Sequence, residues 1–377
     1  MSRILITGGA GFIGSHLANE LILSGYSVRV LDVLSNQVHG EDPYSSELFR
    51  NLSPKIDFIH GDVCSLRSMP MALSDIDIVI HLAAETGTGQ SMYEISKYAQ
   101  TNIIGTSALL ESILLSGKNV KKIIVSSTRA VYGEGKYVCK LHGAVYPKGR
   151  NSDAMKLGNW ELRCLTCGDI LKLAPTDEDS QLNPQSIYGI TKLAQEQMIL
   201  TFAKTYNLSA TALRLQNVYG PGQSLSNPYT GILSVFSTRI LNNSELEIFE
   251  DGEESRDFVY ISDVIEALLL VIKDDNRKVD VYNLGSGIST SVLTIAKSLI
   301  HLLNPSASLT ITGKFRTGDI RHNIADVSKF EEEFGFTKRV TIGEGLPKFA
   351  SWVQSQPIKI DNYEKSITAL NDLGLLN

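Results

Sequence analysis

The chain has few cysteines and no long apolar run. Four cysteines in 377 residues are too few for a disulfide framework. The stretch Ala267–Ile272 is among the longer apolar runs, and it is far short of the roughly 20 residues that a membrane-spanning helix needs. Residues 1–3 lead straight into the apolar run 4–7, without the basic and apolar regions of a signal peptide. We therefore expect a cytoplasmic protein with no membrane partner.

An excess of positive charge is also missing. Lys and Arg total 35 against 41 Asp and Glu, which gives a formal net charge of −6. This balance argues against nucleic acid as the main partner. An anionic ligand would have to be held by a few placed cations and backbone amides. The hydrophobic content of 43% is typical of a folded chain, and the length fits two domains or one large α/β domain with a second lobe.

The first 32 residues have the pattern of a dinucleotide-binding unit. Arg3–Thr7 is a short apolar run followed at once by glycines, which predicts a buried strand. Apolar residues recur at helical spacing over Phe12–Leu23, and Val28–Leu31 predicts a second strand that ends at Asp32. An ordinary tight turn between strand and helix would not require the three spaced glycines and the acid.

Each glycine has a mechanical role in this unit. The first glycines allow the tight turn from strand to helix, Gly11 lets the backbone approach a pyrophosphate, and Gly14 lets the helix pack on the sheet. The helix N-terminus offers free N–H groups to the phosphates. The predicted phosphate-binding residues are Gly8, Gly11, Phe12, Ile13 and Gly14.

Asp32 lies 21 residues after Gly11, where a carboxylate can accept both hydroxyls of the adenosine ribose. No Lys or Arg directly follows it to hold a 2′-phosphate, so the sequence favours NAD over NADP. Asp62 could meet the adenine amino group. The remaining predicted cofactor contacts are Val63, Leu82, Ala83, Ala84 and Asn102.

Strands and helices continue to alternate after this unit. Strands are predicted at Ile56–Ile59, Ile76–Leu82, Lys122–Ser126 and Ala210–Leu215. Long helices are predicted over Met92–Leu115 and Ser186–Tyr206, and the last twenty residues read as a surface helix or tail.

The fold class is therefore α/β, a doubly wound Rossmann-type parallel sheet with a smaller C-terminal α/β lobe. We expect the NAD-binding domain at 1–136 and 180–220, an irregular insertion at 137–179, and the second lobe at 221–377, from which the chain crosses back to the first domain.

A phenol and an ammonium lie four residues apart on one face of the second long helix. Tyr188 and Lys192 form this pair, and the cation would lower the phenol pKa so that Tyr188 acts as a base. Lys192 can also hold the nicotinamide ribose. Thr128, which ends a parallel strand, can donate to the same substrate oxygen. Such a pair is common on helix surfaces, but here it follows a dinucleotide turn in the expected element.

With these motifs the chain resembles the extended short-chain dehydrogenase/reductase family, the NAD-dependent nucleotide-sugar epimerases and dehydratases. The resemblance covers nearly the whole length except 137–179. It rests on the glycine turn 7–14 and on His81-Leu82-Ala83-Ala84, Ser126-Ser127-Thr128, Val131-Tyr132-Gly133, Tyr188 with Lys192, the segment 214–221, Arg256-Asp257-Phe258 and Arg316-Thr317-Gly318-Asp319.

The resemblance implies a substrate site that is shared between the two lobes. Thr86 and Thr128 would contact the sugar, Asn217, Arg256 and Arg316 the diphosphate, Asp319 the nucleotide ribose, and Glu247 and Phe249 the base. For each residue alone, a surface ion pair or a core aromatic is the simpler interpretation.

The resemblance also narrows the reaction. Family members share a first step, in which the tyrosine takes the proton of the sugar C4 hydroxyl and the C4 hydride passes to NAD. A 4,6-dehydratase would have Asp-Glu where this chain has Arg129 and Ala130, so we expect a 4-epimerase. The loop Glu85–Met92 and the cysteine-bearing insertion favour the dTDP-L-rhamnose 4-epimerase type. UDP-glucose, UDP-glucuronate, a dehydratase or reductase of the same fold, and the role of Arg129 stay open.

The insertion contains two short motifs with the spacing of zinc knuckles. Cys139 and His142 are followed by Gly143, and Cys164 and Cys167 are followed by another glycine. Four N and S ligands of this kind would close a tetrahedral structural zinc site. A disulfide, or free thiols in a flexible lid, is the alternative, and Cys64 is expected in the core.

Two further expectations concern partners. The long helices resemble those that form the dimer interface in this family, which implies a homodimer. A hypothesis from another class is an NAD-bound scaffold that has lost catalysis, with the insertion as its docking surface. The intact Thr128, Tyr188 and Lys192 count against that scaffold.

Overall fold

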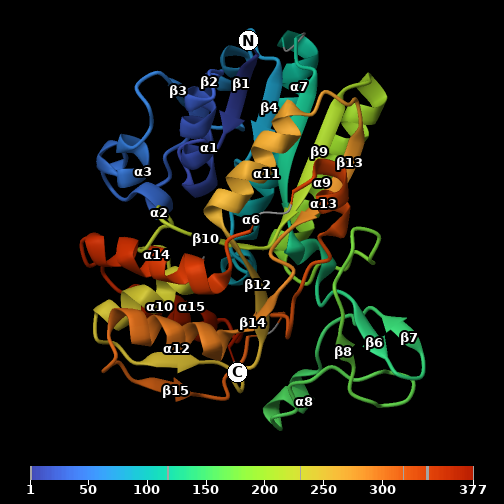
Figure 1. Cartoon of the computed structure of the whole chain (residues 1–377), viewed down its shortest axis with the longest axis vertical. Coiled ribbons are helices and arrows are strands. Elements are labelled where there is room, and N and C mark those ends of the chain that lie inside the picture. Colours follow the sequence, from blue (N-terminus) through green and yellow to red (C-terminus); the bar gives the residue numbers. More distant parts are fainter. Residues whose placement is uncertain (1, 117–118, 230, 317, 337–338, 377) are drawn as a thin grey trace.

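The computed structural model describes residues 2–116, 119–229, 231–316, 318–336 and 339–376. A sheet of seven parallel strands occupies the upper half of the molecule in Figure 1. In spatial order its strands are β13 (Val279–Leu284), β9 (Ser209–Leu215), β5 (Lys122–Thr128), β4 (Ile78–His81), β1 (Arg3–Thr7), β2 (Ser27–Asp32) and β3 (Asp57–His60). The predicted Rossmann-type parallel sheet is confirmed.

The central strands are apolar on both faces because helices cover both. Every residue of β4 is buried. One layer contains α1 (Phe12–Leu23) and α11 (Ile261–Lys273), whose apolar residues share a core with Ile4 and Ile80. The opposite layer consists of α4 (Ser68–Ala72), α7 (Gly105–Ser116) and α9 (Ile187–Tyr206). This double covering makes the unbroken apolar runs of the central strands necessary.

The predicted helix over Met92–Leu115 is interrupted. It consists of α6 (Ile95–Ala99), the π-helical turn η2 (Gln100–Ile104) and α7. Within η2 the buried Asn102 bonds to Glu85 and Thr191. The interruption therefore aims an amide side chain at the loop that follows β4, as π turns often do near functional sites.

Short helices connect the strands of the large sheet. They are α2 (Asn36–His39), η1 (Pro43–Ser45), α3 (Glu47–Arg50), α5 (Thr88–Ser91) and the 3₁₀ turn η3 (Arg129–Tyr132). None of the helices in the described ranges is long and apolar enough to cross a membrane.

The second lobe lies below the carboxyl ends of the parallel strands (Figure 1). Its strands are β10 (Asn217–Tyr219), β12 (Ser255–Tyr260) and β14 (Ser289–Ser291) in one sheet, and β11 (Leu246–Ile248) with β15 (Leu309–Ile311) in another. Its helices are α10 (Ile232–Leu241), α12 (Val292–Leu303), α14 (Ile342–Ser355) and α15 (Tyr363–Asp372), while α13 (Ser328–Phe334) packs on β13. β13 belongs to the large sheet and α11 packs on that sheet. The segment 221–377 therefore contributes both to the Rossmann-type domain and to the second lobe.

The insertion folds as a small unit beside the second lobe (Figure 1). It contains the antiparallel sheet of β6 (Tyr137–Cys139), β7 (Gly143–Val145) and β8 (Lys172–Leu173), and the helix α8 (Ser152–Lys156). Its core consists of only five buried residues: Tyr137, Cys139, Leu162, Cys164 and Leu171. A core this small gives little stability without a covalent or metal link.

Candidate active site

A cavity of about 660 Å³ opens at the carboxyl ends of the parallel strands. Doubly wound sheets bind their ligands at this edge. Its wall includes residues directly after β1, β2, β4 and β5, the segment 215–219 at the end of β9 and in β10, and, from the second lobe, Gln223, Ser224, Asn227, Tyr229 and Gly231–Leu233. The segment 223–233, which supplies Asn227 and Tyr229, was missed by the sequence analysis because it has no motif or period.

The glycine turn at the start of α1 leaves space for a ligand. Gly8 has φ +70°, and a Cβ on Gly14 would lie 2.4 Å from the carbonyl oxygen of Gly8. At the N-cap, Gly11 provides no side chain to accept the first helical N–H groups. These N–H groups point at the cavity wall and suit a pyrophosphate.

The carboxylate of Asp32 is buried and fixed by two backbone donors. Ala10 N–H donates to Oδ2 at 2.9 Å, and Leu34 N–H donates to Oδ1 at 2.8 Å. Each oxygen keeps a lone pair for a ribose hydroxyl. The wall beyond it contains no Lys or Arg in the segment 33–39, and burial lowers the pKa of His39. The site therefore fits NAD better than a cofactor with a 2′-phosphate.

Most of the predicted cofactor residues line this cavity: Gly8, Gly11, Phe12, Ile13, Gly14, Asp32, Asp62, Val63, Leu82, Ala83, Ala84, Tyr188 and Lys192. Asn102 does not. Its amide donates to Glu85 O at 3.1 Å and to Thr191 Oγ1 at 3.0 Å, and it accepts from Glu85 N–H at 2.8 Å. Asn102 thus fixes the loop after β4 to α9. Its effect on a bound cofactor would be indirect, through the position of that loop.

The three predicted catalytic residues all lie at the cavity wall. Thr128 is the last residue of β5, and Tyr188 lies in the first turn of α9, where Ser186 caps the helix by accepting from Gly189 N–H at 3.1 Å. The hydroxyl of Thr128 acts on the phenol of Tyr188 and opposes the rise of its pKa. The two side chains thus share one part of the cavity wall, where a substrate hydroxyl could be bound.

The expected effect of Lys192 on the phenol is not seen. Burial raises the pKa of Tyr188, and only the hydrogen bond from Thr128 and the charge of Arg129 oppose this rise. The ammonium of Lys192 instead donates to Gln195 Oε1, and burial lowers the pKa of Lys192 to about 7. Of these two cations, Arg129 is the one that acts on Tyr188.

A buried polar chain lies behind Lys192. The amide of Gln195 donates to His81 Nε2 at 2.9 Å, and His81 Nδ1 meets Thr7 Oγ1 at 2.7 Å. Burial lowers the pKa of His81 to about 3, so the ring is neutral and holds a fixed tautomer. Sequence analysis did not assign Gln195 a role, although its place one turn after Lys192 was a usable signal.

The predicted substrate residues fall into two groups. Thr86, Thr128 and Asn217 line the cavity. The other five, which are Glu247, Phe249, Arg256, Arg316 and Asp319, lie in the second lobe outside the cavity wall. Thr317 of the segment 316–319 is outside the described residues.

Arg256 and Asp319 are bonded to each other. Arg256 Nη2 donates to Asp319 Oδ1 at 3.0 Å and to Ile320 O at 2.9 Å, and Nη1 donates to the carbonyls of Ser255 and Arg321. Both η nitrogens of Arg256 are therefore occupied by the protein. In this geometry a diphosphate could bond only to Nε, so Arg256 acts on it mainly through charge.

The C-terminal segment covers Arg316 and its neighbours. Arg316 lies over the ring of Phe249 at 4.8 Å and forms an isolated backbone bridge to Leu376. Tyr363 of α15 is close enough to Arg316 and Glu247 for their charges to affect its pKa, which burial raises to about 12. The expected surface helix is thus partly buried and closes this end of the second lobe.

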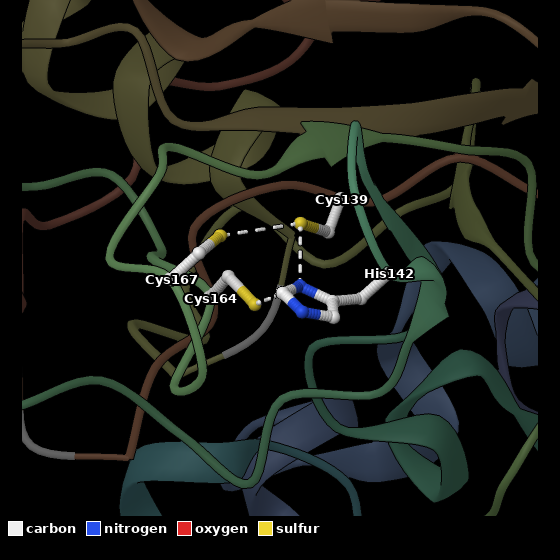
Figure 2. A group of neighbouring side chains, drawn as sticks. All are labelled: Cys139, His142, Cys164 and Cys167. Carbon is white, nitrogen blue, oxygen red and sulfur yellow. Dashed lines mark hydrogen bonds between the residues drawn. The ribbon is translucent and has the colours of Figure 1, made fainter.

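Four side chains of the insertion converge on one point (Figure 2). Cys139 Sγ lies 3.4 Å from His142 Nδ1 and 3.6 Å from Cys167 Sγ, and Cys164 Sγ lies 3.5 Å from His142 Nδ1. All four ligand atoms lie within 4.8 Å of one another, and the cysteines are not disulfide-bonded. Zinc with Zn–S near 2.3 Å and Zn–N near 2.0 Å would set such atoms roughly 3.5–3.8 Å apart. The cluster fits zinc.

The segment between the two cysteine motifs reaches into the second lobe. Arg150 donates to Glu250 Oε2 at 2.7 Å and to the backbone oxygen of Asp319 at 2.9 Å. Farther along, Glu161 accepts from Arg321 Nε at 2.8 Å. The insertion is therefore fastened to the part of the second lobe that contains Arg256 and Asp319.

The model of the NAD dependent epimerase/dehydratase family matches residues 4–148 and 166–285. The match covers more than half of the chain. The residues it skips, 149–165, are those that contain Arg150 and Glu161.

Relatives and solved structures agree with this match. The chain is 35% identical to dTDP-L-rhamnose 4-epimerase of Burkholderia thailandensis, over 94% of this chain and 95% of the relative. UDP-glucose 4-epimerase of Thermotoga maritima with UDP-glucose is similar, with 33% identity, a TM-score of 0.73 and coverage of 94% and 99%. UDP-glucuronic acid 4-epimerase of Bacillus cereus, with UDP-glucuronic acid and NAD, has 27% identity, a TM-score of 0.74 and the same coverage. The chain thus belongs to the NAD dependent epimerase/dehydratase family and is an NAD-dependent nucleotide-sugar enzyme.

Proposed function

We propose that the protein is a 4-epimerase that acts on a dTDP- or UDP-linked hexose. The observation that carries this proposal is that Thr128, Tyr188 and Lys192 lie together at the wall of a cavity that fits NAD. Arg129 and Ala130 follow Thr128 and bring no carboxylate to the sugar. A dehydratase would need such an acid to eliminate water, so the epimerase is the simpler outcome.

The chain's own residues would manage the proton at the sugar C4 oxygen. Thr128 orients the hydroxyl, and Tyr188 takes its proton and later returns it. Bound NAD would accept the C4 hydride and return it to the other face of the 4-keto sugar, which inverts C4 with no net redox change. Gln195 and the neutral His81 keep Lys192 beside the cofactor.

The sugar and the base are proposed from similarity. The 35% identity to the Burkholderia enzyme supports dTDP-L-rhamnose as the first substrate to test. UDP-glucose and UDP-glucuronate are the alternatives, since similar solved structures contain these ligands. We assign NAD to residues 1–136 and 180–220, and the nucleotide sugar to residues 221–377.

We also propose that the cluster of Cys139, His142, Cys164 and Cys167 holds a structural zinc ion. The ligand spacings support it, as does the small core of the insertion, which needs a further link. With four protein ligands the ion has no open position, so it would stabilise the insertion and take no part in catalysis.

We further propose a homodimer in the cytoplasm. Exposed apolar side chains on two neighbouring helical segments support the dimer: Ile95, Ile104, Leu114, Leu115, Ile190 and Tyr206. The four unpaired thiols are consistent with a reducing compartment.

Proton NMR of a nucleotide-sugar panel with trace NAD tests the proposed reaction. The panel contains dTDP-L-rhamnose, UDP-glucose, UDP-glucuronate and dTDP-glucose. We expect a C4 epimer to accumulate to equilibrium without net NADH. A 4-keto-6-deoxy product would make the protein a dehydratase. Binding of a panel member without turnover would support the scaffold.

A further inference from the structure

Arg129 has an unusual position for a charged side chain. It follows Thr128 in η3 and lines the cavity together with Tyr188 and Asn217. Its Nε donates to Asn217 Oδ1 at 3.1 Å. Within the described ranges its two η nitrogens make no hydrogen bond, and neither is sealed away from the cavity.

Four other arginines near the two lobes each have a carboxylate partner, whereas the half-buried Arg316 has no ion pair among the described residues. The shortest N···O distances of these four are 2.7 Å for Arg150, 2.6 Å for Arg214, 3.0 Å for Arg256 and 2.7 Å for Arg321. For Arg129, no carboxylate oxygen of the described residues lies within 4.0 Å of its guanidinium nitrogens. Arg129 is half-buried at the cavity wall, and a cation there without a counter-ion favours a ligand that supplies the anion.

Asn217 strengthens this interpretation. Because its Oδ1 already accepts from Arg129, its amide nitrogen is left to donate. The pair thus offers mainly donors to the cavity. A donor-rich surface with a charged guanidinium favours an acceptor with negative charge.

The position of Arg129 and Asn217 in the site indicates which anionic group of a ligand they would bind. Arg129 is one residue from Thr128, which marks the reacting sugar carbon, and its partner Asn217 lies in β10, which pairs with β12, the strand that contains Arg256. It therefore lies between the sugar and the nucleotide. The group of a nucleotide sugar that joins these two parts is the diphosphate.

We propose that Arg129 binds a phosphate oxygen on the sugar side of the substrate diphosphate and so sets the position of the sugar against Tyr188. This inference rests on the proposed function, because it assumes a nucleotide-sugar substrate. It adds a substrate-binding residue to which the sequence analysis gave no role. Since burial and Arg256 lower the pKa of Arg129 only to about 10, the guanidinium stays charged at neutral pH.

The test compares Arg129→Met and Arg129→Lys with the matched control Arg277→Met, an exposed arginine outside the cavity. Calorimetry of NAD-loaded protein measures the Kd of dTDP, dTDP-L-rhamnose, UDP, UDP-glucose and UDP-glucuronate. We expect Arg129→Met to weaken the nucleoside diphosphates and their sugars alike, by about 10- to 100-fold, the usual loss for a charge-assisted bond. Arg129→Lys should lose less, and bound NAD and Tm should stay unchanged in both.

Each other result would overturn the inference. A loss confined to UDP-glucuronate would place Arg129 at a sugar carboxylate. Unchanged Kd values would make it structural. If Arg129→Met fails to fold, Arg129→Lys decides by the same comparison. Wild-type protein that binds none of the five nucleotides would contradict the proposed function itself, and that failure is visible before any variant is made.

Discussion

Thr128 and Tyr188 line the same cavity, and the Thr128 hydroxyl acts on the pKa of Tyr188, although the whole insertion separates them along the chain. The parallel pairing of β5 and β9 brings them together, because α9 must cross back over the sheet between these two strands. Its first turn therefore begins beside the carboxyl end of β5. The insertion begins shortly after the carboxyl end of β5, so it starts next to the candidate active site.

Tyr188→Phe should abolish most turnover and leave NAD bound. Removal of a general base lowers kcat by about 10²–10⁴-fold. The matched control is Tyr98→Phe, since the Tyr98 ring packs edge to face on Tyr188 and its phenol bonds to Thr86 O and Gln90 Oε1, away from the proposed proton transfer. We expect Tyr98→Phe to lose about fivefold or less. The readouts are epimer formation by NMR and NAD content; equal losses in both variants would contradict the assigned base.

Gly14→Ala should prevent cofactor binding. The new Cβ would lie 2.4 Å from Gly8 O, so α1 must move off the turn. We expect a loss of about 1–3 kcal/mol in the free energy of unfolding. Gly343→Ala in α14 is the control, because the atom nearest to the added Cβ is Thr341 Oγ1, at 3.9 Å. Denaturant unfolding and NAD content check the pair, and NAD retained by Gly14→Ala would show that the turn does not hold it.

Purified protein should contain about one zinc ion per chain. Cys164→Ser should lose the metal and lower the Tm, because the small core of the insertion cannot hold its fold alone. Cys64→Ser should keep both, since Cys64 lies outside the cluster. Metal analysis and thermal unfolding with a chelator check this, and a metal-free wild-type protein after growth in zinc would refute the site.

Arg150→Met should raise the KM for the nucleotide sugar more than it changes kcat. Arg150 links the insertion to Glu250 and to the backbone of Asp319, so its loss loosens that part of the second lobe. It should also destabilise the fold by about 3 kcal/mol, as for other broken buried pairs. Arg163→Met, an exposed residue of the same insertion, should do neither. Steady-state kinetics and unfolding measure both, and an unchanged KM would separate the insertion from substrate binding.

Glu254→Gln should stabilise the protein above neutral pH. Glu254 Oε2 is buried without a hydrogen-bond partner, and burial raises the pKa of Glu254 to about 7. Between its ordinary pKa of about 4.5 and pH 7 the folded state binds more protons than the unfolded state. Stability from this group is therefore complete below pH 4.5 and is lost as the pH rises to 7.

The Tm gained by Glu254→Gln should consequently be larger at pH 8 than at pH 5. Glu253→Gln, an exposed neighbour, is the control and should change the Tm equally at both values. Thermal unfolding across this range checks the prediction. A gain that is independent of pH would mean that Glu254 is not protonated in the folded state at pH 5.

The sequence predicted the large sheet well because each of its signals is local. The glycine turn, the buried strands and the spacing of Tyr188 and Lys192 can be recognised within a few residues. Arg3–Thr7 and Phe12–Leu23 were predicted with the bounds that the structure has. The sequence of the insertion shows no hydrophobic periodicity, because its short strands are held together by a few residues that are far apart in the chain.

By itself the sequence determined the fold class and the fit to NAD, and it proposed the catalytic trio and the four possible zinc ligands, since each depends on residue type at a fixed spacing. Only the tertiary structure decided how these parts act on one another. It placed Arg129 beside Tyr188, turned Lys192 toward Gln195, bound both η nitrogens of Arg256 to protein acceptors, and anchored the insertion through Arg150. The charge on a buried group depends on neighbours from distant elements, and no local pattern specifies these neighbours.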